Sequence, residues 1–197
     1  MRLSLDTAMS DDQISQRIAA VCGRPFLHNI AGRMESSEAA FDVLNPATEA
    51  VLARAPDATR AQLDAAVAAA RRAQPDWADR DAGARREHLL RFAQALRDNA
   101  DEFALLITLE QGKPLKHARL EVERAAGQLE AVTAIALANQ VLRDDASGRV
   151  EMQYRPLGVV GAITPWNMPV VLAVPKISHA LYTGNTLVLK PSEYTPL

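Results

Sequence analysis

The sequence has few of the features that would support an extracellular, metal-binding or nucleic-acid-binding protein. Its single cysteine, Cys22, cannot form an internal disulfide or a zinc site built from cysteines. The 22 Lys and Arg and 24 Asp and Glu leave a formal net charge of -2, which gives no reason to expect nucleic acid or an anionic membrane as a partner. The four histidines lack the spacing typical of metal ligands, so we predict no metal site.

Long apolar runs are also missing. No stretch reaches the roughly 18 consecutive apolar residues that a membrane-spanning helix needs. The start, MRLSLDTAMSDDQ, carries early acidic residues and no apolar core, unlike a secretory signal peptide. The dinucleotide fingerprint G-x-G-x-x-G is absent, because Gly158-x-x-Gly161 lies within a predicted strand and not in the turn after one. These absences favour a cytoplasmic protein.

The clearest structural pattern is a strand–helix–strand unit near the end of the sequence. Leu157–Ile163 is a short apolar run typical of a strand buried on both faces. Pro169 suits the first position of a helix, which Val170–Tyr182 would continue and Gly184 would close. Thr186–Leu189 reads as a second apolar strand. The order predicts two parallel strands joined by a helical crossover, which is an α/β fold.

Polar side chains gather where these two predicted strands end. Thr164–Asn167 follow the first strand, and Lys190–Glu193 follow the second. Open parallel sheets bind their ligands beyond the carboxyl ends of the strands. We therefore expect the chemistry of this protein at that edge.

The region before this unit shows mainly the 3.6-residue period of amphipathic helices. Packing explains each apolar stripe, so we attach no function to them. One helix is expected to end at Pro75, and Asn99 is expected to cap the start of another. The predicted helices are Asp11–Val21, Arg60–Gln74, Arg85–Arg97, a segment from Asn99 to Gly112, and Leu115–Asn139; the predicted strands are Phe26–Ile30, Phe41–Leu44 and Val51–Ala55.

The period then changes from 3.6 to 2. Val150, Met152 and Tyr154 alternate with polar residues, and Val141–Arg143 lies across a turn from them. This pattern predicts an amphipathic hairpin. A two-stranded ribbon is marginal in water by itself, so it must pack on its own domain or on a second subunit, and the sequence leaves both open.

Several short motifs in this order resemble the NAD(P)-dependent aldehyde dehydrogenase superfamily from about residue 25 to the end. One departure is Met168, where the family usually has Phe, and another is Pro175 inside the predicted helix. The motifs are Asn45-Pro46-Ala47-Thr48, Trp77 with Arg85, Glu110-Gln111-Gly112-Lys113-Pro114, Ile163-Thr164-Pro165-Trp166-Asn167-Met168-Pro169, Gly184-Asn185-Thr186 and Lys190-Pro191-Ser192-Glu193.

The resemblance implies the N-terminal part of the aldehyde dehydrogenase fold: a helical layer, the start of a parallel Rossmann-like sheet and a protruding β-hairpin. It divides the chain into residues 1–140, the helical part of the cofactor domain; 141–155, an oligomerisation-type hairpin; and 156–197, the first strand–helix–strand unit of the NAD-binding domain. It also implies an aldehyde substrate and a homo-oligomer formed through the hairpin.

For the site, the resemblance makes Asn167 catalytic: its side-chain amide would donate to the oxyanion formed when a thiolate attacks an aldehyde. Lys190 and Glu193 would bind the adenosine ribose hydroxyls, and Glu193 would favour NAD over NADP by repelling a 2′-phosphate. The residues assigned to cofactor binding are Ile163, Thr164, Pro165, Trp166, Asn167, Lys190, Pro191, Ser192 and Glu193.

Each assignment has a plainer alternative. Asn167 is also a good turn or N-cap residue, and Lys190–Glu193 also suits a strand exit with Ser192 as an N-cap. Lys176 matches a helix lysine given a supporting role in some family members, although a solvated or ion-paired lysine is the simpler explanation. Cys22 lies before the resemblance begins and has no neighbouring base in sequence, so it is not expected to be the nucleophile.

The resemblance also shows what the 197 residues do not provide. Family members are much longer, and their nucleophilic Cys and general-base Glu follow the region matched here. The complete protein is thus expected to oxidise an aldehyde to a carboxylic acid with NAD(P), whereas these residues alone are expected to be inactive. The alternative from another class is a truncated, non-catalytic binding or assembly module that pairs with full-length subunits.

Overall fold

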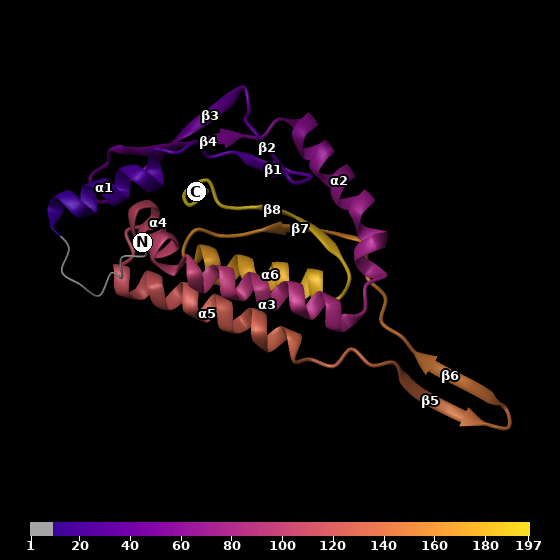
Figure 1. Ribbon diagram of the computed structural model, residues 1–197. Coiled ribbons are helices and arrows are strands. Elements are labelled where there is room, and N and C mark those ends of the chain that lie inside the picture. The colour runs from indigo at the N-terminus through magenta and orange to yellow at the C-terminus, as the bar shows by residue number, and fades with distance from the viewer. Residues whose placement is uncertain (1–9) are drawn as a thin grey trace.

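The computed structural model describes residues 10–197 and shows the expected α/β architecture (Figure 1). Residues 1–9, which make up most of the N-terminal segment compared with a signal peptide, lie outside the described residues. The helices are α1 (Asp11–Cys22), α2 (Arg60–Ala78), α3 (Ala82–Asp98), α4 (Ala100–Gln111), α5 (Leu115–Thr133) and α6 (Pro169–Tyr182). The strands are β1 (His28–Ile30), β2 (Arg33–Glu35), β3 (Ala39–Leu44), β4 (Val51–Asp57), β5 (Gln140–Asp145), β6 (Gly148–Met152), β7 (Val159–Ile163) and β8 (Thr186–Lys190).

The strand–helix–strand prediction is confirmed. β7 and β8 pair in parallel, with Val159 opposite Thr186 and Ile163 opposite Lys190, and α6 connects them. α6 lies beneath the two strands in Figure 1, while α2 also contacts both strands. Gly184, at a φ of 84°, follows the last turn of α6 in the left-handed conformation that glycine adopts most easily.

The expectation that the first of these strands is buried on both faces is wrong. β7 begins at Val159, after Gly158 at a φ of 115°, and only its Ala162 is fully buried. Ile163 is 74% exposed. Among the described residues, β7 pairs only with β8. α2 and α6 cover part of these two strands and leave the rest open to solvent.

Several expected helix ends differ from the structure, and α3 begins at Ala82, three residues before the expected Arg85. α2 runs through Pro75 to Ala78, since the proline lies near the end of the helix and the carbonyl it leaves unpaired belongs to exposed Arg71. α5 stops at Thr133 and not at Asn139. There the Tyr182 hydroxyl donates to the carbonyls of Thr133 and Ile135, at 3.3 and 2.8 Å.

The expected cap at Asn99 also differs from the structure. It occupies the N-cap position of α4, but its side chain makes no capping bond there. Instead, its amide nitrogen donates to the Ala95 carbonyl at 2.8 Å and so satisfies the end of α3. Asn99 therefore stabilises the helix before it, which sequence spacing could not distinguish from the helix after it.

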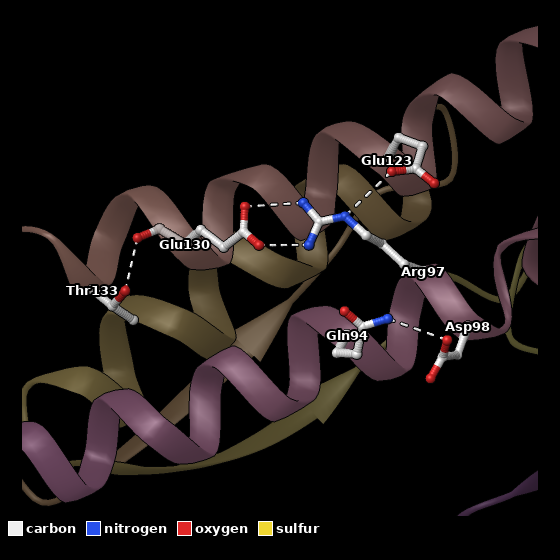
Figure 2. Close-up of polar contacts among 6 residues, drawn as sticks. All are labelled: Gln94, Arg97, Asp98, Glu123, Glu130 and Thr133. Atoms are coloured by element: carbon white, nitrogen blue, oxygen red, sulfur yellow. Dashed lines mark hydrogen bonds and ion pairs between the residues drawn. The ribbon is translucent and has the colours of Figure 1, made fainter.

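The core is formed where α3, α5 and α6 pack together. The apolar stripe predicted for α5 is confirmed as buried from Ala118 to Val132, and its Val122 and Leu129 are fully inaccessible. Ala136, the last predicted member of this stripe, lies beyond the helix and is exposed. At the rim of this core, Arg97 of α3 forms ion pairs with Glu123 and Glu130 of α5; its Nη2 donates to Glu130 Oε2 at 2.9 Å (Figure 2). These pairs are partly exposed, so their contribution to stability is small.

α6 is anchored at its C-terminal end by side chains from α2 and α3. The indole Nε1 of Trp77 donates to the Leu181 carbonyl at 2.9 Å, and Nε of Arg85 donates to the Tyr182 carbonyl at 2.9 Å. Both carbonyls belong to the last turn of the helix, where intrahelical donors run out. The Leu181 carbonyl also accepts from the Gly184 N–H at 3.1 Å, so Trp77 gives it a second donor, whereas Arg85 supplies a donor to the Tyr182 carbonyl.

The predicted hairpin is present as β5 and β6, which pair antiparallel and project away from the rest of the molecule in Figure 1. Every residue of β5 is exposed, including Val141 and Leu142. Arg149 bridges Asp144 and Glu151 along the ribbon. Within residues 10–197, no helix is long and apolar enough to span a membrane.

Candidate functional site

The structure brings the two predicted polar segments together. The N–H of Thr164, just after β7, donates to the Lys190 carbonyl at the end of β8, at 3.1 Å. Thr164 is buried, whereas Pro165, Trp166 and Asn167 are exposed. The loop that enters α6 and the loop that leaves β8 therefore share one edge of the sheet.

Asn167 lies two residues before α6, and its main chain is held from outside its own loop. Its carbonyl accepts from Gln111 Nε2 at 3.0 Å and from Lys113 Nζ at 3.1 Å. Among residues 10–197 we find no hydrogen-bond partner for its side-chain amide. The backbone is fixed while the amide is available to a ligand.

The start of α6 has an unusual cap. The side chain of its N-cap residue, Met168, makes no capping hydrogen bond, and the helix begins at Pro169. Glu121 of α5 supplies the acceptor: its Oε1 receives the N–H groups of Val170 at 3.0 Å and Val171 at 3.2 Å. A carboxylate is favourable at this position because the N-terminus of a helix carries partial positive charge.

Glu121 is also paired with Lys113 through its other oxygen. The Lys113 side chain is 14% exposed and that of Glu121 only 1% exposed. Lys113 Nζ therefore bonds both the carboxylate that caps α6 and the carbonyl of Asn167. Two residues from the α4–α5 region hold both sides of the junction between loop and helix.

The loop after β8 presents an exposed ion pair. Lys190 Nζ lies 3.2 Å from Glu193 Oε2, and both side chains are more than half exposed. The backbone N–H of Glu193 itself and then Lys190 hold the pKa of this carboxyl below its usual value. Ser192 accepts from the Tyr194 N–H at 3.2 Å, and Pro191 precedes it. An ionised carboxylate thus faces solvent at the sheet edge.

Lys176 and Cys22 lie elsewhere. Lys176 of α6 is exposed, beside an open hollow that it lines with Gly161, Ile163 and His179. Cys22 ends α1 and packs against α4; burial, followed by the nearby Glu110, raises the pKa of its thiol. A raised pKa disfavours the reactive thiolate, so the structure gives Cys22 no activation as a nucleophile.

Sequence reasoning did not identify Gln111, Lys113 and Glu121 as parts of the site. The first two appear only as members of a motif. Glu121 carried a usable signal, because helical spacing places it beside Ala118 and Val122 on the apolar stripe of α5. A carboxylate on a buried stripe is expected to have a specific partner.

Comparison with known proteins finds one family over most of the chain. The model of the aldehyde dehydrogenase family matches residues 33–197. The malonate-semialdehyde dehydrogenase 2 of Geobacillus thermodenitrificans is 44% identical over 158 residues, which cover 79% of this chain and 33% of the relative. The "Probable succinate-semialdehyde dehydrogenase [NADP(+)]" of Sinorhizobium fredii is 40% identical over 162 residues, covering 80% of this chain and 33% of the relative.

Solved structures agree with this result. The betaine aldehyde dehydrogenase of Staphylococcus aureus in complex with NAD+ matches with a TM-score of 0.87 at 27% identity, covering 93% of this chain and 38% of the other. The gamma-glutamyl-gamma-aminobutyraldehyde dehydrogenase of Burkholderia cenocepacia matches with a TM-score of 0.86 at 34% identity, covering 93% and 39%. The chain spans about a third of the length of the curated relatives it matches.

Proposed function

Because the chain belongs to the aldehyde dehydrogenase family, we propose that it forms part of an enzyme that oxidises an aldehyde to a carboxylic acid with NAD(P). The observation that carries this proposal is Asn167, whose carbonyl is fixed by Gln111 and Lys113 while its side-chain amide remains available. A neutral amide suits an oxyanion because it stabilises developing charge without gaining or losing a proton. The residues to which we assign a role include neither the nucleophile nor the general base of the family mechanism.

The residues at the sheet edge fit a dinucleotide. Lys190 and Glu193 offer a donor and an ionised acceptor to the ribose hydroxyls, and Pro191 and Ser192 shape the turn between them. On the neighbouring loop, Ile163, Thr164, Pro165 and Trp166 would supply backbone and apolar surface. When bound, the nicotinamide accepts the hydride; the role of these residues is to bind and orient it.

The function is testable in an extended chain: residues 1–197 followed by the remaining two-thirds of the Geobacillus thermodenitrificans relative. We expect this extended chain to reduce NAD in the presence of an aldehyde, as followed by NADH absorbance, and residues 1–197 alone to show no turnover. A folded extended chain that oxidises no member of an aldehyde panel would contradict the proposal. Turnover by residues 1–197 alone would contradict the assignment of the nucleophile to another part of the enzyme.

We propose NAD as the preferred cofactor, although relatives include a protein named for NADP(+) and one bound to NAD+. Glu193→Gln in the extended chain is expected to lower the NAD/NADP ratio of kcat/KM by about two- to fivefold, the scale of one exposed charge interaction. Asp64→Asn, which removes an exposed carboxylate paired with Arg60 on α2, is the matched control. A wild-type preference for NADP would contradict this assignment.

The alternative, an assembly module, draws support from the exposed hairpin, and we propose that the hairpin mediates homo-oligomerisation. Leu142 on β5 is 62% exposed and Met34 on β2 is 60% exposed. Leu142→Glu is expected to shift the extended chain to smaller species in size-exclusion chromatography, whereas the control Met34→Glu leaves its elution unchanged. If both variants elute like the parent, the hairpin is not the assembly surface.

The domain division belongs to the same proposal: residues 1–140 support the cofactor domain, 141–155 mediate assembly and 156–197 begin the nucleotide-binding sheet. If residues 1–197 bind full-length subunits but have no effect on turnover, the non-catalytic assembly module is the better description. The cytoplasmic location proposed for the protein rests on the single cysteine and the ordinary composition.

A further inference from the structure

We propose that Lys113 and Glu121 are positioning residues that set the direction in which Asn167 presents its side-chain amide. The inference rests on the proposed function, since it concerns the same oxyanion donor. With Gln111, these residues form what we call the Asn167 clamp. None of the three touches the reacting atoms in this proposal; they act through the main chain on either side of Met168.

The clamp restrains the junction at two points. Before Met168, the Asn167 carbonyl accepts from Gln111 at 3.0 Å and from Lys113 at 3.1 Å. After Met168, the first free amides of α6, on Val170 and Val171, donate to Glu121 at 3.0 and 3.2 Å. The Lys113–Glu121 ion pair joins the two points. The peptide plane after Asn167 and the axis of α6 are thereby fixed relative to each other, and with them the Cα–Cβ direction of Asn167.

Its burial distinguishes the Lys113–Glu121 ion pair from a contact that serves only stability. Its side chains are 14% and 1% exposed, so both charges lose hydration, and such a pair often contributes little net stability. A Ser or Asp at position 168 could cap α6 locally at lower desolvation cost. A buried pair that reaches across from α5 does what a local cap cannot: it fixes the helix start relative to the core. The Arg97–Glu130 pair of Figure 2 has no comparable link to the site.

The first test compares Lys113→Met with Lys113→Arg in the extended chain. Lys113→Met is expected to lower kcat by at least about tenfold, approaching the 10²-fold that a misplacement of about 1 Å can cause, with the KM for NAD unchanged. Lys113→Arg keeps the charge and its donors and is expected to recover most of kcat. Arg97→Met, which removes a cation of the partly exposed α3–α5 pairs, is the matched control and should leave kcat unchanged.

A double variant separates positioning from stability. Lys113→Met leaves the Glu121 carboxylate buried without its cation, which itself destabilises the fold. Lys113→Met combined with Glu121→Gln is neutral and keeps an oxygen that can accept from Val170 and Val171. It is expected to restore the unfolding midpoint while kcat stays low, because the Lys113 donor to the Asn167 carbonyl is still missing and only Gln111 remains. Recovery of kcat together with stability would overturn the inference and leave the pair a purely structural role.

A readout independent of activity distinguishes failure of this inference from failure of the proposed function. Amide hydrogen exchange over residues 167–171 is expected to accelerate in Lys113→Met and in the double variant, and to stay unchanged in Arg97→Met. If the parent extended chain is inactive, the proposed function fails, and exchange alone decides whether the clamp restrains this segment. Unchanged exchange in Lys113→Met and in the double variant would refute the clamp even if the enzyme is active.

Discussion

Asn167→Ala in the extended chain is expected to lower kcat by about 10²–10³-fold, a loss of about 2.7–4 kcal/mol of transition-state stabilisation. The reason is that one preorganised donor to the oxyanion disappears, while the backbone held by Gln111 and Lys113 is retained. The loss should appear in kcat, as measured by steady-state kinetics at saturating NAD, because the amide acts on charge that develops only in the reaction.

Binding and stability measurements distinguish this role from that of a turn residue. The Kd for NAD should change little, because the cofactor contacts proposed for this loop are made by backbone and apolar groups. The free energy of unfolding should fall by no more than about 1 kcal/mol, the scale of a turn or cap substitution. Asn167→Asp should be at least as impaired, since a carboxylate offers no donor and repels the oxyanion. An unchanged kcat with a lowered midpoint would mean that Asn167 is only a turn residue.

The second large effect concerns stability and involves Glu110 of α4. Its side chain is buried, and this burial raises the pKa of its carboxyl from 4.5 to about 7, although the Leu197 N–H donates to it at 2.8 Å and opposes the shift. The folded state therefore binds a proton between these values that the unfolded state releases. The associated stability is fully present below pH 4.5 and is lost as pH rises through about 7, amounting to about 3 kcal/mol at most.

Glu110→Gln removes this titration and keeps an acceptor for the Leu197 N–H. It is expected to stabilise the protein at pH 8 by up to about 3 kcal/mol and to flatten the dependence of its unfolding free energy on pH. Denaturant unfolding of the chain between pH 4 and pH 8 measures both. Glu102→Gln, at a half-buried site on the same helix where the carboxylate pairs with Arg24, controls for the loss of one carboxylate. A fall with rising pH in Glu110→Gln that is as steep as in the wild type, or steeper, would show that the Glu110 carboxyl is not the group responsible.

Local patterns predicted the elements that position the site. Pro169 and Gly184 marked the two ends of α6, and the apolar runs beside them marked β7 and β8. The alternation after Arg149 likewise predicted the hairpin. These features depend on neighbours within a few residues, which is the distance over which propensity and period carry information.

What sequence reasoning missed depends on contacts between distant segments. Lys113 and Glu121 meet the start of α6 from 49 to 54 residues away, and no local pattern specifies that approach. α5 ends early because Tyr182 bonds the carbonyls at its end, a contact that again joins distant residues. The predicted two-sided burial of β7 failed because that prediction counted apolar residues without knowing which segments would cover them.

The attachment of α6 at both ends has a mechanical consequence. Trp77 and Arg85 donate hydrogen bonds to the final carbonyls of α6, and Glu121 accepts from its first free amides. A helix tethered in this way transmits a displacement along its axis more readily than it absorbs one by fraying. Asn185 accepts from the Gly158 N–H and so bridges the starts of β7 and β8. α6, about four turns long, therefore connects the turn around Asn185 rigidly to the loop that carries Asn167. Strain applied to the β8 side of the sheet would shift the position of the loop that carries Asn167, with little change in the shape of that loop.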